Sequence, residues 1–267
     1  MKPLPVAGEG LFVLGDLTTR EHNRPGDERV RLRTGRVLVV GVGGLGCPAA
    51  TTLAAAGVGT IGLIDPDLVE LSNLHRQILH GDADLGRPKV ESAREKLVGI
   101  APDTTIRTYE TKLTAENLAA VFGEFDFVID GTDTVAAKFL INDGAVLTGT
   151  PYSHAGILGF RGQTLTVLPR RTTCYRCLFP VPPPPGEVPT CQEAGVIGAV
   201  GGALGVIQAG EAIKFILGEG ELLSDRLLTF DALALRWRTV KLRRNPRCPV
   251  CGEQPSITVL GEHAQAA

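Results

Sequence analysis

Four cysteines arranged in two close pairs constrain this chain more than any other feature. The pairs are Cys174 with Cys177 and Cys248 with Cys251, and each has two residues between its members. That gap lets both thiolates of a pair reach one metal ion, and four thiolates complete a closed tetrahedral zinc shell. A closed shell leaves no position for water, so we expect structural zinc that ties the C-terminal region to the middle of the chain. A redox CxxC pair or two disulfides are the alternatives, but redox motifs normally occur singly and such short-gap disulfides are strained.

Length and charge exclude several classes of protein. The chain has 267 residues, a net charge of −2 and a pI near 6.2. This length suits one large domain or two small ones, and the charge balance lacks the basic footprint expected of a nucleic-acid-binding protein. No charged segment followed by an apolar stretch occurs near Met1. Together with six cysteines, this predicts a reducing, cytoplasmic location and metal binding by the thiols.

One apolar segment, from Val196 to Leu217, has to be distinguished from a membrane span. Gln208, Glu211 and Lys214 interrupt it at intervals of three residues. The uninterrupted apolar part is therefore too short to cross a bilayer. We expect a buried, glycine-rich helix and no membrane association.

Short apolar runs alternate with helical patterns over residues 36–155, which predicts an α/β fold with a doubly wound, mostly parallel, Rossmann-like sheet. The pattern changes after residue 155 to hairpin-like segments, which predict a C-terminal antiparallel extension. We therefore divide the chain into an atypical N-terminal arm (1–35), one domain (36–252) and a C-terminal tail (253–267). The domain has a nucleotide-binding half (about 36–155) and a half that carries the cysteine pairs (about 156–252). The predicted strands are 37–40, 61–65, 106–110, 125–130, 157–167 (a hairpin), 227–231 and 237–242, and the predicted helices are 45–56, 88–98, 114–122 and 133–144.

A glycine-rich loop follows the first predicted strand and opens the first helix. Its glycines are Gly41, Gly43, Gly44 and Gly46. Glycines in this context permit a tight turn and let backbone N–H groups approach a phosphate at the helix N-terminus. Asp65 ends the second strand, where a carboxylate can accept hydrogen bonds from ribose hydroxyls. Taken alone, this half of the sequence favours an NAD(P)-dependent oxidoreductase.

A polar cluster after Asp65 favours a triphosphate instead of a dinucleotide. Arg76 and Lys89 supply positive charge for phosphates, and Asn73 adds a neutral donor. Asp133 follows the fourth strand at the same edge of the sheet, where an acid beside a triphosphate is favourable only with a divalent cation between them. We therefore interpret Asp133 as a magnesium ligand. The alternative is that the cations are solvated surface charges and Asp133 is only the N-cap of the next helix.

The motifs resemble, in content and order, those of the MoeB/ThiF/HesA family, the bacterial relatives of ubiquitin-activating enzymes. The similarity extends over about residues 36 to 252 and is greatest to MoeB-type members. The motifs that carry it are Gly-x-Gly-Gly-x-Gly at 41–46, Asp65-x-Asp67, Ser72-Asn73-Leu74-x-Arg76-Gln77, Pro88-Lys89, Thr132-Asp133, both CxxC pairs and Thr190-Cys191-x-Glu193-x-Gly195-Val196.

The resemblance implies an ATP-dependent adenylyltransferase. Members of the family use ATP and Mg²⁺ to couple AMP to the C-terminal Gly-Gly carboxylate of a ubiquitin-fold sulfur carrier, MoaD- or ThiS-like, in molybdopterin, thiamine or thiolation pathways. The resemblance also implies a homodimer, and it assigns catalysis to Asp133 and Arg76. No general base is required, because the attacking carboxylate is already ionised at neutral pH. The residues that the resemblance assigns to the nucleotide and its magnesium are Gly41, Gly43, Gly44, Gly46, Asp65, Asp67, Asn73, Arg76, Lys89 and Asp133.

Two cysteines lie outside the CxxC pairs. Cys191 follows a proline-rich stretch, and the matching loop cysteine of some family members takes the acyl group as a thioester or a persulfide-linked intermediate. The alternative for Cys191, which we favour, is a partly buried and unreactive side chain. Cys47, beside the glycine loop, is expected to serve packing.

The chain departs from the family pattern in two places. The family's N-terminal Arg-Tyr-x-Arg-Gln segment, whose second arginine reaches the ATP of the partner subunit, has no counterpart in residues 1–35. Arg20 and Arg24 are the nearest candidates. The family's usual asparagine after Thr-Asp is Thr134 here. The unusual N-terminal region motivates a third hypothesis, a catalytically degenerate scaffold that binds a ubiquitin-like protein without turnover.

Overall fold

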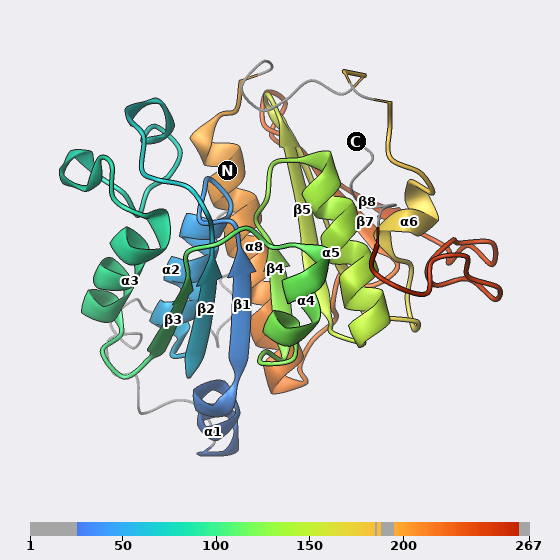
Figure 1. Cartoon of the computed structure of the whole chain (residues 1–267), viewed down its shortest axis with the longest axis horizontal. Coiled ribbons are helices and arrows are strands. Elements are labelled where there is room, and N and C mark those ends of the chain that lie inside the picture. Colours follow the sequence, from blue (N-terminus) through green and yellow to red (C-terminus); the bar gives the residue numbers. More distant parts are fainter. Residues whose placement is uncertain (1–25, 185, 188–194, 262–267) are drawn as a thin grey trace, which may run out of the picture.

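Eight strands form one mixed sheet, in the order β3-β2-β1-β4-β5-β6-β7-β8 (Figure 1). The computed structural model describes residues 26–184, 186–187 and 195–261. The first five strands pair in parallel, and β6, β7 and β8 add antiparallel strands, so both parts of the predicted fold class are confirmed. The strands are β1 (Arg36–Val40), β2 (Thr60–Ile64), β3 (Thr105–Tyr109), β4 (Phe127–Asp130), β5 (Tyr152–Leu158), β6 (Arg161–Val167), β7 (Arg226–Asp231) and β8 (Arg236–Lys241).

Helices cover both faces of the parallel part, as expected for a doubly wound sheet. In Figure 1, α4 and α5 lie in front of the sheet and α8 lies behind it. The side chains of β1 show why both faces are covered: Val37 and Val39 join one buried apolar cluster, and Leu38 and Val40 join another. The helices are α1 (Gly26–Thr34), α2 (Gly46–Ala56), α3 (Lys89–Ile100), α4 (Ala115–Phe122), α5 (Val135–Thr148), α6 (Tyr175–Leu178) and α8 (Gly198–Leu217), with short 3-10 helices η2 (Leu71–Asn73) and η3 (Asp82–Asp84).

The start of α5 corrects one expectation. Thr134, not Asp133, is the N-cap, because its hydroxyl accepts a hydrogen bond from the Ala137 N–H at 3.3 Å. The helix also continues four residues past Gly144, to Thr148, where Gly149 ends it with a φ of +78°. Asp133 is thus not committed to the helix end.

Helix α8 is long and apolar enough to cross a membrane, but it is a core element of this fold. It packs against α2 and against β4, β5 and β6. Its buried Gln208 donates hydrogen bonds of 2.9 Å to the carbonyls of Asp130 and Ser153, and its buried Glu211 accepts one of 2.6 Å from the Thr166 hydroxyl. Polar side chains with such specific partners bind the helix to the sheet.

The sheet reverses its winding between β1 and β4. The chain leaves β1 towards β2 on one side and leaves β4 towards β5 on the other. The backbones of Gly41 and Gly131, which follow these two strands, almost touch: a Cβ on Gly41 would lie 2.9 Å from the Gly131 oxygen. Ligands of doubly wound folds bind in the crevice outside the strand ends at such a reversal.

Candidate active site

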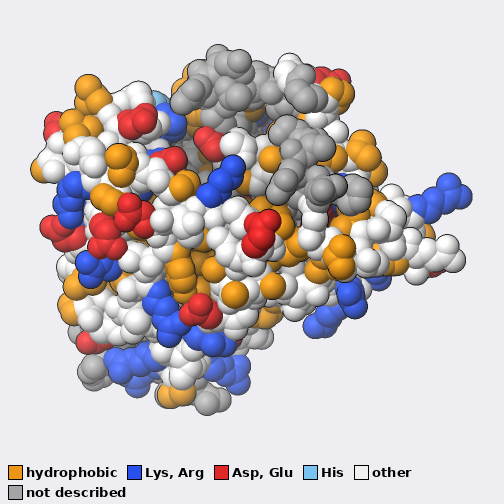
Figure 2. Space-filling model, in the orientation of Figure 1, with side chains coloured by type: hydrophobic (Ala, Val, Ile, Leu, Met, Phe, Trp, Pro, Cys, Tyr) orange, Lys and Arg blue, Asp and Glu red, His pale blue; other side chains and the backbone are white. Residues whose placement is uncertain are grey.

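A cavity of about 1590 Å³ opens along the carboxyl ends of the parallel strands. It is lined by the glycine loop after β1 and also by Arg236 and Arg238 of β8, so it crosses the sheet from β1 to β8. Typical small-molecule pockets measure roughly 300–1,000 Å³, so this one has room for more than a nucleotide. Figure 2 shows acidic and basic side chains interspersed around this edge of the sheet.

The glycine loop is tightly folded at the start of α2. A Cβ on Gly46 would lie only 1.9 Å from the Gly41 oxygen, so no other residue fits there without moving the loop. Gly43 and Gly44 line the cavity. A loop of this kind at a helix N-terminus presents backbone N–H groups to a phosphate.

Asp65 lies at the end of β2 and organises this loop. One carboxylate oxygen accepts the Val42 N–H at 2.7 Å and the other accepts the Asp67 N–H at 2.8 Å. Burial raises the pKa of Asp65. Each oxygen has a further lone pair, so the carboxylate can hold the loop and still accept a ribose hydroxyl from the cavity.

Two cationic side chains, Lys89 and Arg76, line the cavity. Lys89 is buried and its Nζ lies 2.7 Å from Asp67 Oδ2, while the Asp67 side chain is 63% exposed. The aliphatic part of Arg76 covers Gly44, and its guanidinium donates a 2.6 Å hydrogen bond to Asn73 Oδ1. Asn73 is not one of the residues that line the cavity, so its observed role is to hold Arg76.

Asp133 lies in the loop between β4 and α5, exposed and lining the same cavity. Five residues predicted from the sequence therefore line one cavity: Asp65, Asp67, Arg76, Lys89 and Asp133. An exposed carboxylate that faces a cavity with two cations can serve a divalent cation between itself and a phosphate.

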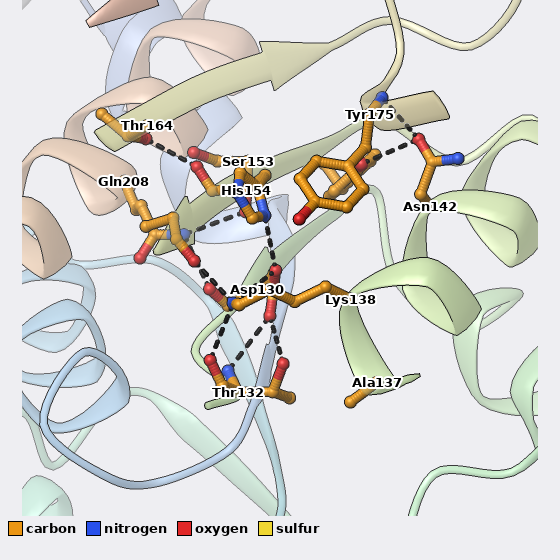
Figure 3. Close-up of polar contacts among 12 residues, drawn as sticks. Asp130, Thr132, Ala137, Lys138, Asn142, Ser153, His154, Thr164, Tyr175 and Gln208 are labelled. Carbon is orange, nitrogen blue, oxygen red and sulfur yellow. Dashed lines mark hydrogen bonds and ion pairs between the residues drawn. The ribbon is translucent and has the colours of Figure 1, made fainter. Parts of the chain in front are cut away.

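Sequence reasoning missed a buried polar cluster around Asp130, at the end of β4 (Figure 3). Asp130 is fully buried and contacts His154 Nδ1 at 2.9 Å and Lys138 Nζ at 3.1 Å. It also accepts the Thr132 N–H at 3.0 Å and the Thr132 hydroxyl at 2.6 Å. Burial alone would raise the pKa of Asp130, but the charge of Lys138 and the hydrogen bonds from His154 and Thr132 outweigh it and hold that pKa to about 2.

Lys138 and His154 complete this cluster in different ways. Lys138 Nζ also donates to the carbonyls of Thr132 at 2.8 Å and Ala155 at 2.6 Å, so all three of its protons are used. Burial lowers the pKa of His154 and favours the neutral ring. A signal was present in the sequence, because Asp130 is a charged residue at the end of an otherwise apolar strand.

The four paired cysteines converge, as their spacing predicts. Their Sγ atoms all lie within 4.8 Å of one another, with contacts of 3.4, 3.6 and 3.9 Å. Zn–S bonds of about 2.3 Å in a tetrahedron place sulfurs about 3.8 Å apart, so the cluster fits zinc. The Asn245 N–H donates to Cys177 Sγ at 3.4 Å, an outer contact typical of metal-bound thiolates.

The structure describes only one of the remaining candidate residues. Cys47 is fully buried, and burial raises its pKa to about 12, so the packing role expected for it is confirmed. Cys191, Arg20 and Arg24 lie outside the described residues.

Relatives with named functions align with most of this chain. It is 45% identical over 238 residues to the sulfur carrier protein adenylyltransferase of Thermus thermophilus, covering 87% of this chain and 88% of that protein. It is 47% identical over 223 residues to the SAMP-activating enzyme E1 of Haloferax volcanii, covering 84% and 82%. It is 45% identical over 250 residues to the probable adenylyltransferase/sulfurtransferase MoeZ of Mycobacterium tuberculosis, but spans only 64% of that longer protein. These names support an adenylyltransferase and give no support to an NAD(P) oxidoreductase.

A solved structure shares the fold of this chain, and a sequence family matches most of its length. The E. coli MccB complex with ATP has a TM-score of 0.75 at 24% identity, covering 84% of this chain and 69% of that one, which shows the shared fold. The sequence matches the ThiF family over residues 20–250. Because this match takes in the glycine loop and the residues that line the cavity, the chain belongs to the ThiF family.

Proposed function

We propose that this protein is an ATP-dependent adenylyltransferase that activates the C-terminal carboxylate of a ubiquitin-fold sulfur carrier ending in Gly-Gly. The observation that carries the proposal is the single cavity that joins the glycine loop, Arg76, Lys89 and Asp133 and then continues to β8. The names of the Thermus and Haloferax relatives support the same reaction.

Charge neutralisation is the main catalytic requirement. The carrier carboxylate attacks the α-phosphorus of ATP, a new C–O–P linkage forms, and the bond to pyrophosphate breaks. Both reactants are anionic, so fixed cations and aligned N–H donors supply most of the stabilisation. In this chain, Lys89 and Arg76 are the cations, and the glycine loop supplies the N–H donors. Asp67 holds Lys89 in place through their ion pair.

Asp133 is the residue that we assign to magnesium. The bound ion would neutralise phosphate charge, and Asp133 offers it an exposed carboxylate on the cavity wall. Asp65 would accept a ribose hydroxyl with the lone pairs that its two backbone contacts leave free.

The part of the cavity beyond the nucleotide would hold the tail of the carrier. Two C-terminal glycines are thin enough to reach a phosphate inside a cavity while the folded carrier stays outside. As part of the same proposal, we assign zinc to the four-cysteine cluster, a homodimeric assembly to the protein and a cytoplasmic location to the reaction. We assign no covalent step to Cys191.

Carrier-dependent exchange of labelled pyrophosphate into ATP tests the proposal. The Gly-Gly-ended ubiquitin-fold proteins of the source organism would be assayed one at a time, with each carrier lacking its last two glycines as the matched control. We expect exchange with at least one intact carrier and none with its truncated form. Absence of exchange with every intact carrier would refute adenylation. Calorimetry adds a second comparison: ATP with Mg²⁺ should bind, and NAD⁺ and NADP⁺ should not.

A further inference from the structure

Tyr175 belongs to both the cysteine cluster and the cavity. It is the first residue of α6, between Cys174 and Cys177, and its side chain lines the cavity. Figure 3 shows its hydroxyl pointing away from α6 towards Asp130 and Lys138. The metal-binding turn therefore contributes a side chain to the site where the nucleotide is expected.

The position of Tyr175 is fixed from several directions. Its N–H donates to Asn142 Oδ1 at 2.8 Å, and its ring lies 4.5 Å from that of His154 and 5.1 Å from that of Phe139. The next residue, Arg176, forms a buried ion pair of 2.7 Å with Asp143. A group held this way needs little reorganisation to meet a ligand, which is the condition for an effective fixed donor.

The hydroxyl of Tyr175 differs from the other two tyrosine hydroxyls of the chain. The Tyr109 hydroxyl donates to Glu124 at 3.1 Å, and the Tyr152 hydroxyl donates to Asn142 at 3.0 Å. The Tyr175 hydroxyl makes no hydrogen bond to any of the described residues. It is also not among the fully buried polar atoms that lack a partner, so part of its surface is accessible. The hydroxyl therefore faces the cavity with no acceptor among the described residues, and a bound ligand can supply that acceptor.

The surroundings indicate what kind of partner this is. A phenol is protonated at neutral pH and donates its proton. Lys138 next to it has no proton left to offer, because Asp130, Thr132 and Ala155 accept all three. Tyr175 thus adds an available donor to the cavity that Asp133 also lines, and an anionic oxygen is the best acceptor for it.

We propose that the Tyr175 hydroxyl donates a hydrogen bond to the oxygens at the junction of the carrier carboxylate and the α-phosphate as the acyl-adenylate forms. This inference rests on the proposed adenylation and adds a substrate-contacting residue to it. It also gives the metal-binding turn a second task, because the same turn that would bind zinc orients a reacting-site donor.

The test compares the three tyrosines by the same substitution. Tyr175→Phe keeps the ring and removes only the hydroxyl, so thermal stability should stay unchanged. A hydrogen bond to a charged group is worth about a 10- to 100-fold effect. We expect the turnover of pyrophosphate exchange to fall by about that factor while KM for ATP stays constant. Affinity for glycyl-sulfamoyl adenosine, a stable mimic of the acyl-adenylate, should fall similarly in calorimetry.

Tyr109→Phe and Tyr152→Phe are the matched controls. Tyr109→Phe should be silent in every assay, and Tyr152→Phe should lower the melting temperature, because Asn142 loses a buried partner, without a matching loss of turnover. If Tyr175→Phe matches the wild type in exchange and mimic binding, the contact does not exist although adenylation stands. If its only effect is weaker ATP binding, the contact is to ground-state ATP and the inference is wrong. A wild-type protein that supports no exchange and does not bind the mimic would overturn the function and the contact together.

Discussion

His154 Nδ1 and Asp130 Oδ2 lie 2.9 Å apart in the protein interior, where the parallel pairing of β4 and β5 ends. The two residues are direct partners in the register of β4 and β5. Through Thr132, the same carboxylate holds the backbone that leads to Asp133. The orientation of the exposed Asp133 at the cavity therefore depends on the buried Asp130 cluster, to which Thr132 connects it.

This cluster makes stability depend on pH in two ranges. Burial lowers the pKa of His154, so the folded protein resists protonation of this ring and stability should fall as pH drops below about 6.5. The pKa of Asp130 is depressed from 3.8 to about 2, so its contribution is present above pH 4 and is lost between about pH 4 and pH 2. That second loss amounts to about 2 kcal/mol. Urea unfolding at pH 7.5, 5.5, 4 and 2 measures both.

Asp130→Asn and Asp126→Asn separate the buried cluster from surface charge. Asp130→Asn leaves Lys138 buried without its counter-charge and should cost about 3–5 kcal/mol at pH 7. Asp126 pairs with Arg36 on the surface, with exposed fractions of 37% and 45%, so Asp126→Asn should change stability by less than about 1 kcal/mol. If the two substitutions lower the free energy of unfolding equally, the buried cluster contributes no more to stability than a surface ion pair, and the prediction is wrong.

Asp133 and Thr134 are neighbours with separable roles. Asp133→Ala should reduce carrier-dependent exchange by about 100- to 1,000-fold, because an essential charge contact is lost, with no change in melting temperature. Thr134→Ala should cost about 1 kcal/mol of stability through loss of the α5 cap and leave exchange nearly intact. Exchange assays and thermal unfolding of both variants check this, and a stability loss in Asp133→Ala would show that the acid is structural.

Local patterns in the sequence were enough to predict the strands, the glycine loop and the cysteine cluster. Buried parallel strands produce continuous apolar runs, and the thiolate spacing limits how a metal can be bound. Thr134 could not be chosen over Asp133 as the cap, because both residue types cap helices and they are adjacent. The Asp130 cluster was missed because β4, β5 and α5 meet only in the folded sheet, and no spacing in the sequence reports that Asp130 faces His154 and Lys138.

Two glycines of the phosphate loop should respond differently to the same added methyl group. Gly46→Ala would place its Cβ 1.9 Å from the Gly41 oxygen, so the loop must move and ATP binding should be lost together with about 1–3 kcal/mol of stability. A Cβ on Gly43 would have only Gln77 Nε2 near it, at 3.5 Å, so Gly43→Ala should fold normally. Gly43 lines the cavity, and its methyl should raise KM for ATP by obstructing a phosphate. Gly210→Ala on α8, where the added Cβ would have no neighbour within 4 Å, is the control that should leave ATP binding unchanged.

Metal removal should affect folding before it affects chemistry. Cys248 and Cys251 lie in a C-terminal turn that forms no helix or strand, so an ion held by the four cysteines would join that turn to α6 and keep it ordered. We expect one zinc per chain by mass spectrometry, and a loss of at least about 3 kcal/mol on chelation, as for a ligand present at 100 times its Kd or more. Hydrogen exchange should rise first over residues 243–252. Cys248→Ser should reproduce these effects, while Cys47→Ala should keep the zinc. If chelation abolishes pyrophosphate exchange while the melting temperature stays constant, the cysteine cluster has a direct chemical role and the structural assignment is wrong.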